Sequence, residues 1–151
     1  MGMRCVPIVL AALLAACGDK PTSIQDLNAT EVRLPNGTKI MAESMRDQVD
    51  MVRGLMFRDS LAANRGMMFF HGSDNRYPYF TYQYKIPVDM VWIDHDERIV
   101  EIVSDVKPCP EGTAASACPA YGGHQNARYV LQVNAGFAAK NDMRAGEKLD
   151  F

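Results

Sequence analysis

Short apolar or alternating runs, separated by glycine, proline and asparagine, follow one another from about residue 28 to the end of the chain. The clearest run is Val88–Ile93, bounded by Pro87 and by an acidic turn, and Ile99–Val106 follows it as the second arm of a hairpin. The pair Asn36-Gly37 lies between two alternating runs and predicts another hairpin, because both residues tolerate a positive φ. Many short strands with this punctuation predict a mainly β domain, built as a compact antiparallel sandwich or barrel.

About eight strands and one or two short helices are expected in this domain. The predicted strand ranges are 30–34, 38–43, 67–70, 77–84, 88–93, 99–106, 127–133 and 146–151. A helix is predicted over residues 48–55, since Asp47 can cap it and Val49, Val52 and Met56 share one helical stripe. One or two further helical turns are predicted within Gly136–Asn141.

The N-terminal segment does not belong to this fold. Arg4 precedes an apolar stretch from Val6 to Ala16, which is eleven residues long. A membrane-spanning helix needs about 20 apolar residues, so the stretch predicts a cleaved signal peptide over residues 1–16. The tetrad Leu14-Ala15-Ala16-Cys17 resembles a bacterial lipobox, in which the cysteine is acylated and becomes the first residue. Ordinary secretion with a free Cys17 is the alternative.

Lipidation of Cys17 would hold the protein on a membrane surface. Residues 17–27 are then expected to form a tether, and its small, polar stretch 18–25 has a reach of roughly 15 Å as a flexible chain. We therefore expect a lipid-anchored protein on the periplasmic face of a bacterial membrane, and Gly18 favours the outer membrane. Residues 28–151 are expected to form a single domain.

Four cysteines are present, but Cys5 leaves with the signal peptide and Cys17 takes the lipid. Cys109 and Cys118 remain, in a loop rich in proline, glycine, alanine and serine. In an oxidising compartment this pair predicts one disulfide. Zinc would need two more ligands, and only His124 is near, so no metal site is expected here.

The formal net charge of −2 provides no basic field for a polyanion, so nucleic acid is not an expected partner. No phosphate-binding loop or cofactor motif is present in the sequence, and we expect a monomer without a cofactor.

The stretch "RGLMFRDSLAANRGMMFF", residues 53–70, contains two Gly-apolar-Met steps, each running into phenylalanine. We interpret it as a packing element. Gly54 and Gly66 would allow backbones to approach closely. The space between helix and sheet would be filled by Leu55, Met56, Phe57, Met67 and Phe69.

Four ordered motifs resemble the family called domain of unknown function 192. They are the segments Arg53–Arg58, Gly66–Phe69, Ile86–Met90 and Tyr129–Gly136, and the likeness covers roughly residues 28–151. Exported, lipoprotein-type members also resemble this chain in a cysteine pair before the Tyr-Val-Leu strand. The resemblance implies a jelly-roll-like, mostly β domain and no established activity. Phe80–Tyr84 departs from the Trp-Met-x-Asn-Thr stretch that members usually carry.

Asp89 is the most suggestive candidate for chemistry because its neighbours in the predicted strand are apolar. A buried carboxylate is costly unless it is paired or hydrogen-bonded. It would be a general base or ligand anchor with Arg53 or Arg58 as an anion clamp. The alternative is a structural carboxylate that accepts backbone N–H groups or pairs with one of these arginines. No catalytic residue is assigned.

The aromatic segment offers a second candidate site. Tyr82 and Tyr84 share one face of the predicted strand and would stack on a sugar ring of an envelope glycan or on a small molecule, or else form part of the core. Met67, Met68 and His71 form the only tight group that suggests copper(I), although methionine is more often a core filler.

The leading hypothesis is a non-enzymatic, membrane-tethered accessory or ligand-binding domain of the bacterial envelope. One alternative is an envelope hydrolase or transferase that uses Asp89 with Arg53 or Arg58. A second alternative is periplasmic copper handling.

Overall fold

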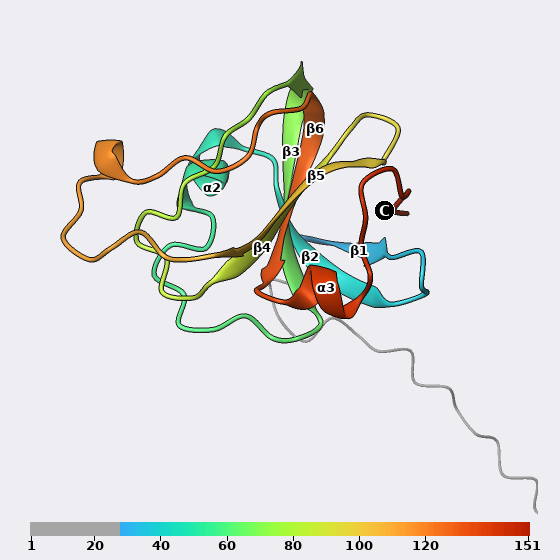
Figure 1. The fold of residues 1–151 in the computed structure, drawn as a ribbon, viewed down its shortest axis with the longest axis horizontal. Coiled ribbons are helices and arrows are strands. Elements are labelled where there is room, and N and C mark those ends of the chain that lie inside the picture. Colours follow the sequence, from blue (N-terminus) through green and yellow to red (C-terminus); the bar gives the residue numbers. More distant parts are fainter. Residues whose placement is uncertain (1–27) are drawn as a thin grey trace, which may run out of the picture.

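The computed structural model describes residues 28–151. The predicted signal peptide, the tether and the lipidation site Cys17 lie outside the described residues. The fold is mainly β, as predicted, with six strands, two short α-helices and one 3-10 turn (Figure 1). The elements are β1 (Ala29–Arg33), β2 (Lys39–Met45), α2 (Gln48–Arg53), β3 (Arg65–Asn75), β4 (Val88–Ile93), β5 (Ile99–Val106), η1 (Ala115–Ala117), β6 (Ala127–Asn134) and α3 (Phe137–Lys140).

All six strands belong to one sheet with the order β1-β2-β3-β6-β4-β5. The two predicted hairpins are confirmed. In the β1–β2 turn Gly37 has a φ of 86°, and the Asn36 side chain accepts a hydrogen bond from the Thr38 N–H. In the β4–β5 turn the Asp94 carboxylate accepts from the backbone N–H groups of Asp96 and Arg98. These side chains replace the backbone partners that a tight turn leaves without bonds.

The expectation of a purely antiparallel sheet is wrong at one place. β2 and β3 are parallel, with Met41 opposite Arg65 and Met45 opposite Phe69, whereas every other pair is antiparallel. Parallel neighbours need a long crossover connection, and here residues 46–64, which include α2, provide it.

The expected number of eight strands is also wrong, because two predicted strands form only isolated bridges. Residues 77–84 contribute a single bridge, Tyr79 to Tyr121, since Pro78 lacks an N–H and Gln83 turns the chain with a φ of 55°. The C-terminal residues 146–151 bridge Lys148 to Arg98 beside β5 and Asp150 to Arg33 on β1. The sheet is not closed, but this segment passes between its two edge strands, so the barrel arrangement is only approximate (Figure 1).

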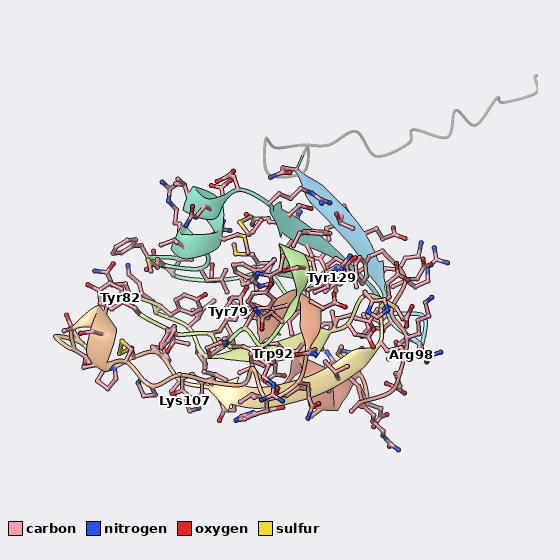
Figure 2. All side chains as sticks on the ribbon, turned by 90° about the horizontal axis from the view of Figure 1, so that it is seen from above. Tyr79, Tyr82, Trp92, Arg98, Lys107 and Tyr129 are labelled. Atoms are coloured by element: carbon pink, nitrogen blue, oxygen red, sulfur yellow. A yellow bond between two sulfur atoms is a disulfide. The ribbon has the colours of Figure 1, made fainter. Side chains whose placement is uncertain are left out.

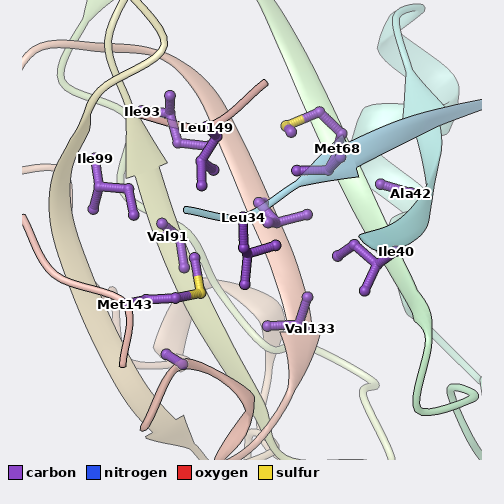
Figure 3. Close-up of a cluster of buried hydrophobic side chains, with 13 residues drawn as sticks. Leu34, Ile40, Ala42, Met68, Val91, Ile93, Ile99, Val133, Met143 and Leu149 are labelled. Atoms are coloured by element: carbon purple, nitrogen blue, oxygen red, sulfur yellow. The ribbon is translucent and has the colours of Figure 1, made fainter. Parts of the chain in front are cut away.

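Each face of the sheet carries its own core. The aliphatic cluster lies on one face and is shown in Figure 3; its buried members are Val32, Leu34, Ile40, Ala42, Met68, Val91, Ile93, Ile99, Leu131, Val133, Ala138, Met143 and Leu149. The aromatic cluster lies on the other face; its buried members are Met45, Leu55, Met67, Phe69, Tyr84, Val88, Met90, Trp92, Val106, Ala127 and Val130. Successive residues of a strand point to opposite faces, which is why Met67 and Met68 belong to different clusters.

The helix that was predicted from the apolar stripe exists, but the stripe does not face the core. Asp47 caps α2 through a hydrogen bond from the Asp50 N–H, as predicted. Val49 and Val52, however, are 66% and 67% exposed, and no residue of α2 is buried. The following turn also differs from expectation, since Leu55 is buried whereas Phe57 is 59% exposed. The interpretation of residues 53–70 as a pure packing element is therefore wrong for Phe57 and correct for Leu55, Met67 and Phe69.

Candidate functional site

A cleft of about 450 Å³ opens between α2 and the aromatic segment 77–84, over the aromatic cluster. Figure 2 shows Tyr79 and Tyr82 on the side of the sheet that α2 covers. The lining is predominantly apolar, and its members are Gln48, Met51, Val52, Met56, His71, Tyr77, Pro78, Tyr79, Phe80, Tyr82, Tyr84 and Ala115. The size and the apolar lining are typical of a small-molecule site.

Two residues with a positive φ lie after α2 and contact the residues around Tyr84, which lines the cleft. Gly54 ends α2 with a φ of 43°, and a Cβ there would lie 3.0 Å from the Tyr84 hydroxyl oxygen, so the close approach at Gly54 is to a side chain and not to a backbone as predicted. Phe57 has a φ of 63°, and its N–H donates to the Gln83 carbonyl at 2.9 Å. A positive φ is unfavourable for a bulky residue such as phenylalanine. Strained backbone of this kind is common at functional sites.

The tyrosine hydroxyls of the cleft are mostly occupied by bonds within the protein. The Tyr84 hydroxyl donates to Gln132 Oε1 at 2.8 Å, and Tyr77 donates to the Ser73 carbonyl at 2.7 Å. The Tyr79 hydroxyl is hydrogen-bonded to His71 Nε2 at 3.0 Å. These bonds leave the cleft with few free polar groups, so its surface is more apolar than four tyrosines would suggest.

His71 is uncharged at neutral pH. Its ring stacks on Tyr77 with a centroid distance of 3.5 Å and an interplanar angle of 5°. Burial lowers the pKa of the His71 imidazole to about 4, because the surrounding rings cannot solvate a cation. Burial also raises the pKa values of the Tyr79 and Tyr84 hydroxyls, which therefore stay protonated.

A second cavity of about 930 Å³ adjoins the cleft and shares Tyr82 and Tyr84 with it. Its far wall is the cysteine loop, residues 108–114. The predicted disulfide is confirmed, with an S–S distance of 2.08 Å between Cys109 and Cys118. The loop is fixed to the aromatic segment at Thr81, whose hydroxyl donates to the Lys107 carbonyl and whose carbonyl accepts from the Cys109 N–H.

Asp89 is completely buried, but it lies apart from both cavities and belongs to the face of the aliphatic cluster. One carboxylate oxygen accepts from the Asp105 N–H at 2.8 Å and the Gly136 N–H at 3.1 Å. The other accepts from the Ala138 N–H at 2.8 Å. Two of these bonds satisfy the backbone at the start of α3 and the third satisfies Asp105 on β5, and the carboxylate has no access to solvent. Asp89 is thus a structural carboxylate. It accepts hydrogen bonds from backbone N–H groups and is not paired with an arginine.

Arg53 and Arg58 are not near Asp89. Arg58 forms a two-pronged ion pair with the Glu43 carboxylate, with distances of 2.5 and 2.6 Å. This pair also raises the pKa of the Arg58 guanidinium. Arg53 is exposed on α2 and lines a smaller, polar cavity with Asp50, Arg58 and Asn28. A paired Arg58 is a poor clamp for an external anion.

Two of the predicted site residues, Tyr82 and Tyr84, do come together in the cleft. Met67 and Met68 point to opposite faces and are fully buried, so they cannot share one metal ion with His71. Within residues 28–151 no group of three or more histidine, cysteine, aspartate or glutamate side chains could hold a metal ion.

Sequence reasoning missed the residues that α2 and the turn after it contribute to the cleft. Met51 and Val52 of α2 and Met56 of the turn line it together with Pro78 and Phe80. The stripe of Val49 and Val52 was the available signal, but the stripe was assigned to the core. Neither helix in the described part of the chain has the length and apolar character needed to cross a membrane.

Solved structures with this fold exist. A candidate transcription regulator from Sinorhizobium meliloti is 24% identical and superposes with a TM-score of 0.70, over 80% of this chain and 89% of its own. A protein of unknown function from Novosphingobium aromaticivorans is 22% identical with a TM-score of 0.71, over 91% of this chain and 94% of its own. At this identity the likeness concerns the fold alone. No curated protein matches the chain.

The model of domain of unknown function 192, described as an uncharacterised ACR, matches residues 31–151 and so spans nearly the whole described domain. This chain therefore belongs to the family of domain of unknown function 192.

Proposed function

We propose that this protein is a non-enzymatic binding domain, tethered to a membrane of the bacterial envelope through Cys17, which holds a small apolar ligand in the cleft between α2 and residues 77–84. The observation that carries the proposal is the cleft itself: about 450 Å³ in volume, open, and lined mainly by methionine, valine and aromatic side chains.

The ligand is expected to be apolar rather than a sugar. A sugar needs several free hydrogen-bonding groups beside the ring on which it stacks. Here the hydroxyls of Tyr77, Tyr79 and Tyr84 are already bonded within the protein, and His71 is uncharged at neutral pH. An apolar body with at most a few polar atoms suits such a surface.

The alternatives find less support. The hydrolase or transferase hypothesis depended on Asp89, which is sealed by three backbone N–H groups and lies apart from the cleft. The copper hypothesis depended on Met67 and Met68 acting together, and they point to opposite faces of the sheet.

Two valines on α2 give a matched test. Val49 and Val52 have nearly equal exposure, 66% and 67%, but only Val52 lines the cleft. The mature chain with Cys17→Ser, which stays in solution without detergent, is titrated with the apolar fluorescent probe N-phenyl-1-naphthylamine. Val52→Lys should raise the Kd about tenfold, since loss of one valine contact costs about 1.5 kcal/mol. Val49→Lys should leave the Kd unchanged.

Soluble sugars should not displace the probe. Equal loss of binding in both lysine variants, or displacement of the probe by sugars, would contradict an apolar ligand in this cleft.

A further inference from the structure

The four exposed large hydrophobic side chains of residues 28–151 gather at one place. They are Val49, Val52, Phe57 and Phe80, with exposed fractions of 66%, 67%, 59% and 47%. Val52 and Phe80 line the cleft, Phe57 lines the adjoining cavity, and Val49 lies on the same helix as Val52. We call these four residues the apolar rim. Isolated exposed hydrophobic residues are ordinary, but a gathering of all of them marks an interaction surface.

The start of the described chain lies beside the apolar rim. Asn28 lines one polar cavity together with Asp50 and Arg53 of α2, and its backbone and side chain bond to Ser44 at the end of β2. In Figure 2 β1 begins on the same side of the molecule as α2. The chain before Asn28 therefore leaves the domain next to the helix that carries two of the four rim residues.

The length of the preceding chain decides which face meets a membrane. In the proposed function eleven residues, 17–27, join the anchor to Asn28, and a chain of eleven residues reaches roughly 18 Å by random-coil scaling. A domain of this size has a radius of gyration of about 14 Å. Such a domain is about 36 Å wide, which is about twice the reach of the tether, so the tether brings the face from which it leaves toward the membrane and holds the opposite face away.

We propose that the apolar rim docks on the lipid bilayer to which the protein is tethered, so that the cleft opens toward the acyl chains. This inference rests on the tethering in the proposed function. Phenylalanine and valine at the surface of a peripheral protein insert at the boundary between headgroups and acyl chains. Asp47, Asp50 and Arg53 place charges of both signs on and beside α2, so apolar contact rather than net charge holds this face to the bilayer.

A nitroxide spin label tests the orientation directly. The mature chain has no free thiol once Cys17 carries lipid and Cys109 is bonded to Cys118, so an introduced cysteine is labelled alone. Val49→Cys places the label in the rim. Lys107→Cys is the control, because Lys107 is exposed and lies on the side of the molecule away from α2 (Figure 2).

The lipidated protein is reconstituted on vesicles of phosphatidylethanolamine and phosphatidylglycerol. The label at residue 49 should lose its collisions with a water-soluble nickel chelate severalfold and gain collisions with oxygen, whereas the label at residue 107 should stay in water. Raising the salt concentration should not return the label at residue 49 to water. Adding Phe57→Asp and Phe80→Asp should return the label at residue 49 to water.

A label at residue 49 that stays in water on the vesicles would overturn the proposal, and so would a buried label that the two aspartates leave in place. Binding of the probe in solution is measured without a membrane. Loss of membrane docking and loss of ligand binding in the cleft are therefore detected by separate experiments. Mass spectrometry shows whether Cys17 carries lipid, and so tests the tether itself.

Discussion

The two faces of the sheet are covered in different ways. On one face the aliphatic cluster is sealed by Leu34, Met143 and Leu149 together with α3, and Asp89 binds the backbone that starts this helix. On the other face the aromatic cluster is buried next to the sheet, but its outer layer opens into the cleft. The residues of the first cluster are all buried. The second combines a buried inner layer with an outer layer that leaves apolar side chains in water.

The largest expected effect tests the closed face. Asp89→Asn should lower the free energy of unfolding by about 3 kcal/mol, because an amide presents an NH₂ group to backbone N–H groups that need an acceptor. Urea denaturation measures the change. Asp105→Asn is the matched control, since Asp105 is exposed and asparagine tolerates its positive φ. At temperatures where Asp89→Asn is folded, the probe should bind with unchanged Kd. Weaker binding would show that the aliphatic face affects the cleft on the other face.

The disulfide belongs to the open face. Replacing Cys109 and Cys118 together by alanine removes the closure of a short loop and should lower the free energy of unfolding by about 2.5 kcal/mol. The loop also carries Ala115 of the cleft, so the Kd for the probe should rise as well. Reduction of the unmodified protein should reproduce both changes. Lost stability with unchanged probe binding would show that the loop does not shape the cleft.

Acid should weaken the protein through His71. The pKa of this imidazole is about 4 in the folded state, against an ordinary value of about 6.5, so between these pH values the unfolded state binds a proton that the folded state does not. Stability is therefore complete above pH 6.5 and falls as the pH decreases toward 4. Because the ring is partly exposed, the loss should be about 1–2 kcal/mol. His71→Gln should flatten this part of the curve, whereas His124→Gln on the surface should retain it.

The smallest expected effect concerns the backbone strain at Phe57. Phe57→Gly should raise the free energy of unfolding by about 0.5 kcal/mol, because glycine accepts a φ of 63° and the exposed ring loses little burial. Phe80→Gly is the control, since Phe80 is similarly exposed but has no positive φ, and it should not be stabilised. A destabilised Phe57→Gly would mean that this ring supports the fold after all.

The sequence predicted those parts of the structure that local rules determine. The β4–β5 hairpin follows from its apolar run and its acidic turn, and the disulfide follows from the inferred compartment. The surroundings of Asp89 could not be predicted in detail, because its partners at Gly136 and Ala138 lie 47 and 49 residues away in the sequence.

The helix stripe shows a second limit of local rules. Periodicity states which residues share one side of α2, namely Val49 and Val52, but it does not state whether that side faces the sheet or the solvent. The tight contact of Gly54 with Tyr84, at the end of the helix, is a tertiary feature that the stripe does not contain. For the same reason the sequence pointed only to the aromatic residues of the cleft and not to those that α2 contributes.

The parallel pairing of β2 with β3 has a consequence for how this family can vary. The connection that joins them, residues 46–64, carries α2, Phe57 and four of the twelve residues that line the cleft, yet it contributes no strand to the sheet. If Leu55, which packs in the aromatic cluster, is kept, the rest of this connection can be exchanged between relatives while the register of the strands is kept. Chimeras that transplant this connection should retain their melting behaviour and acquire the ligand preference of the donor.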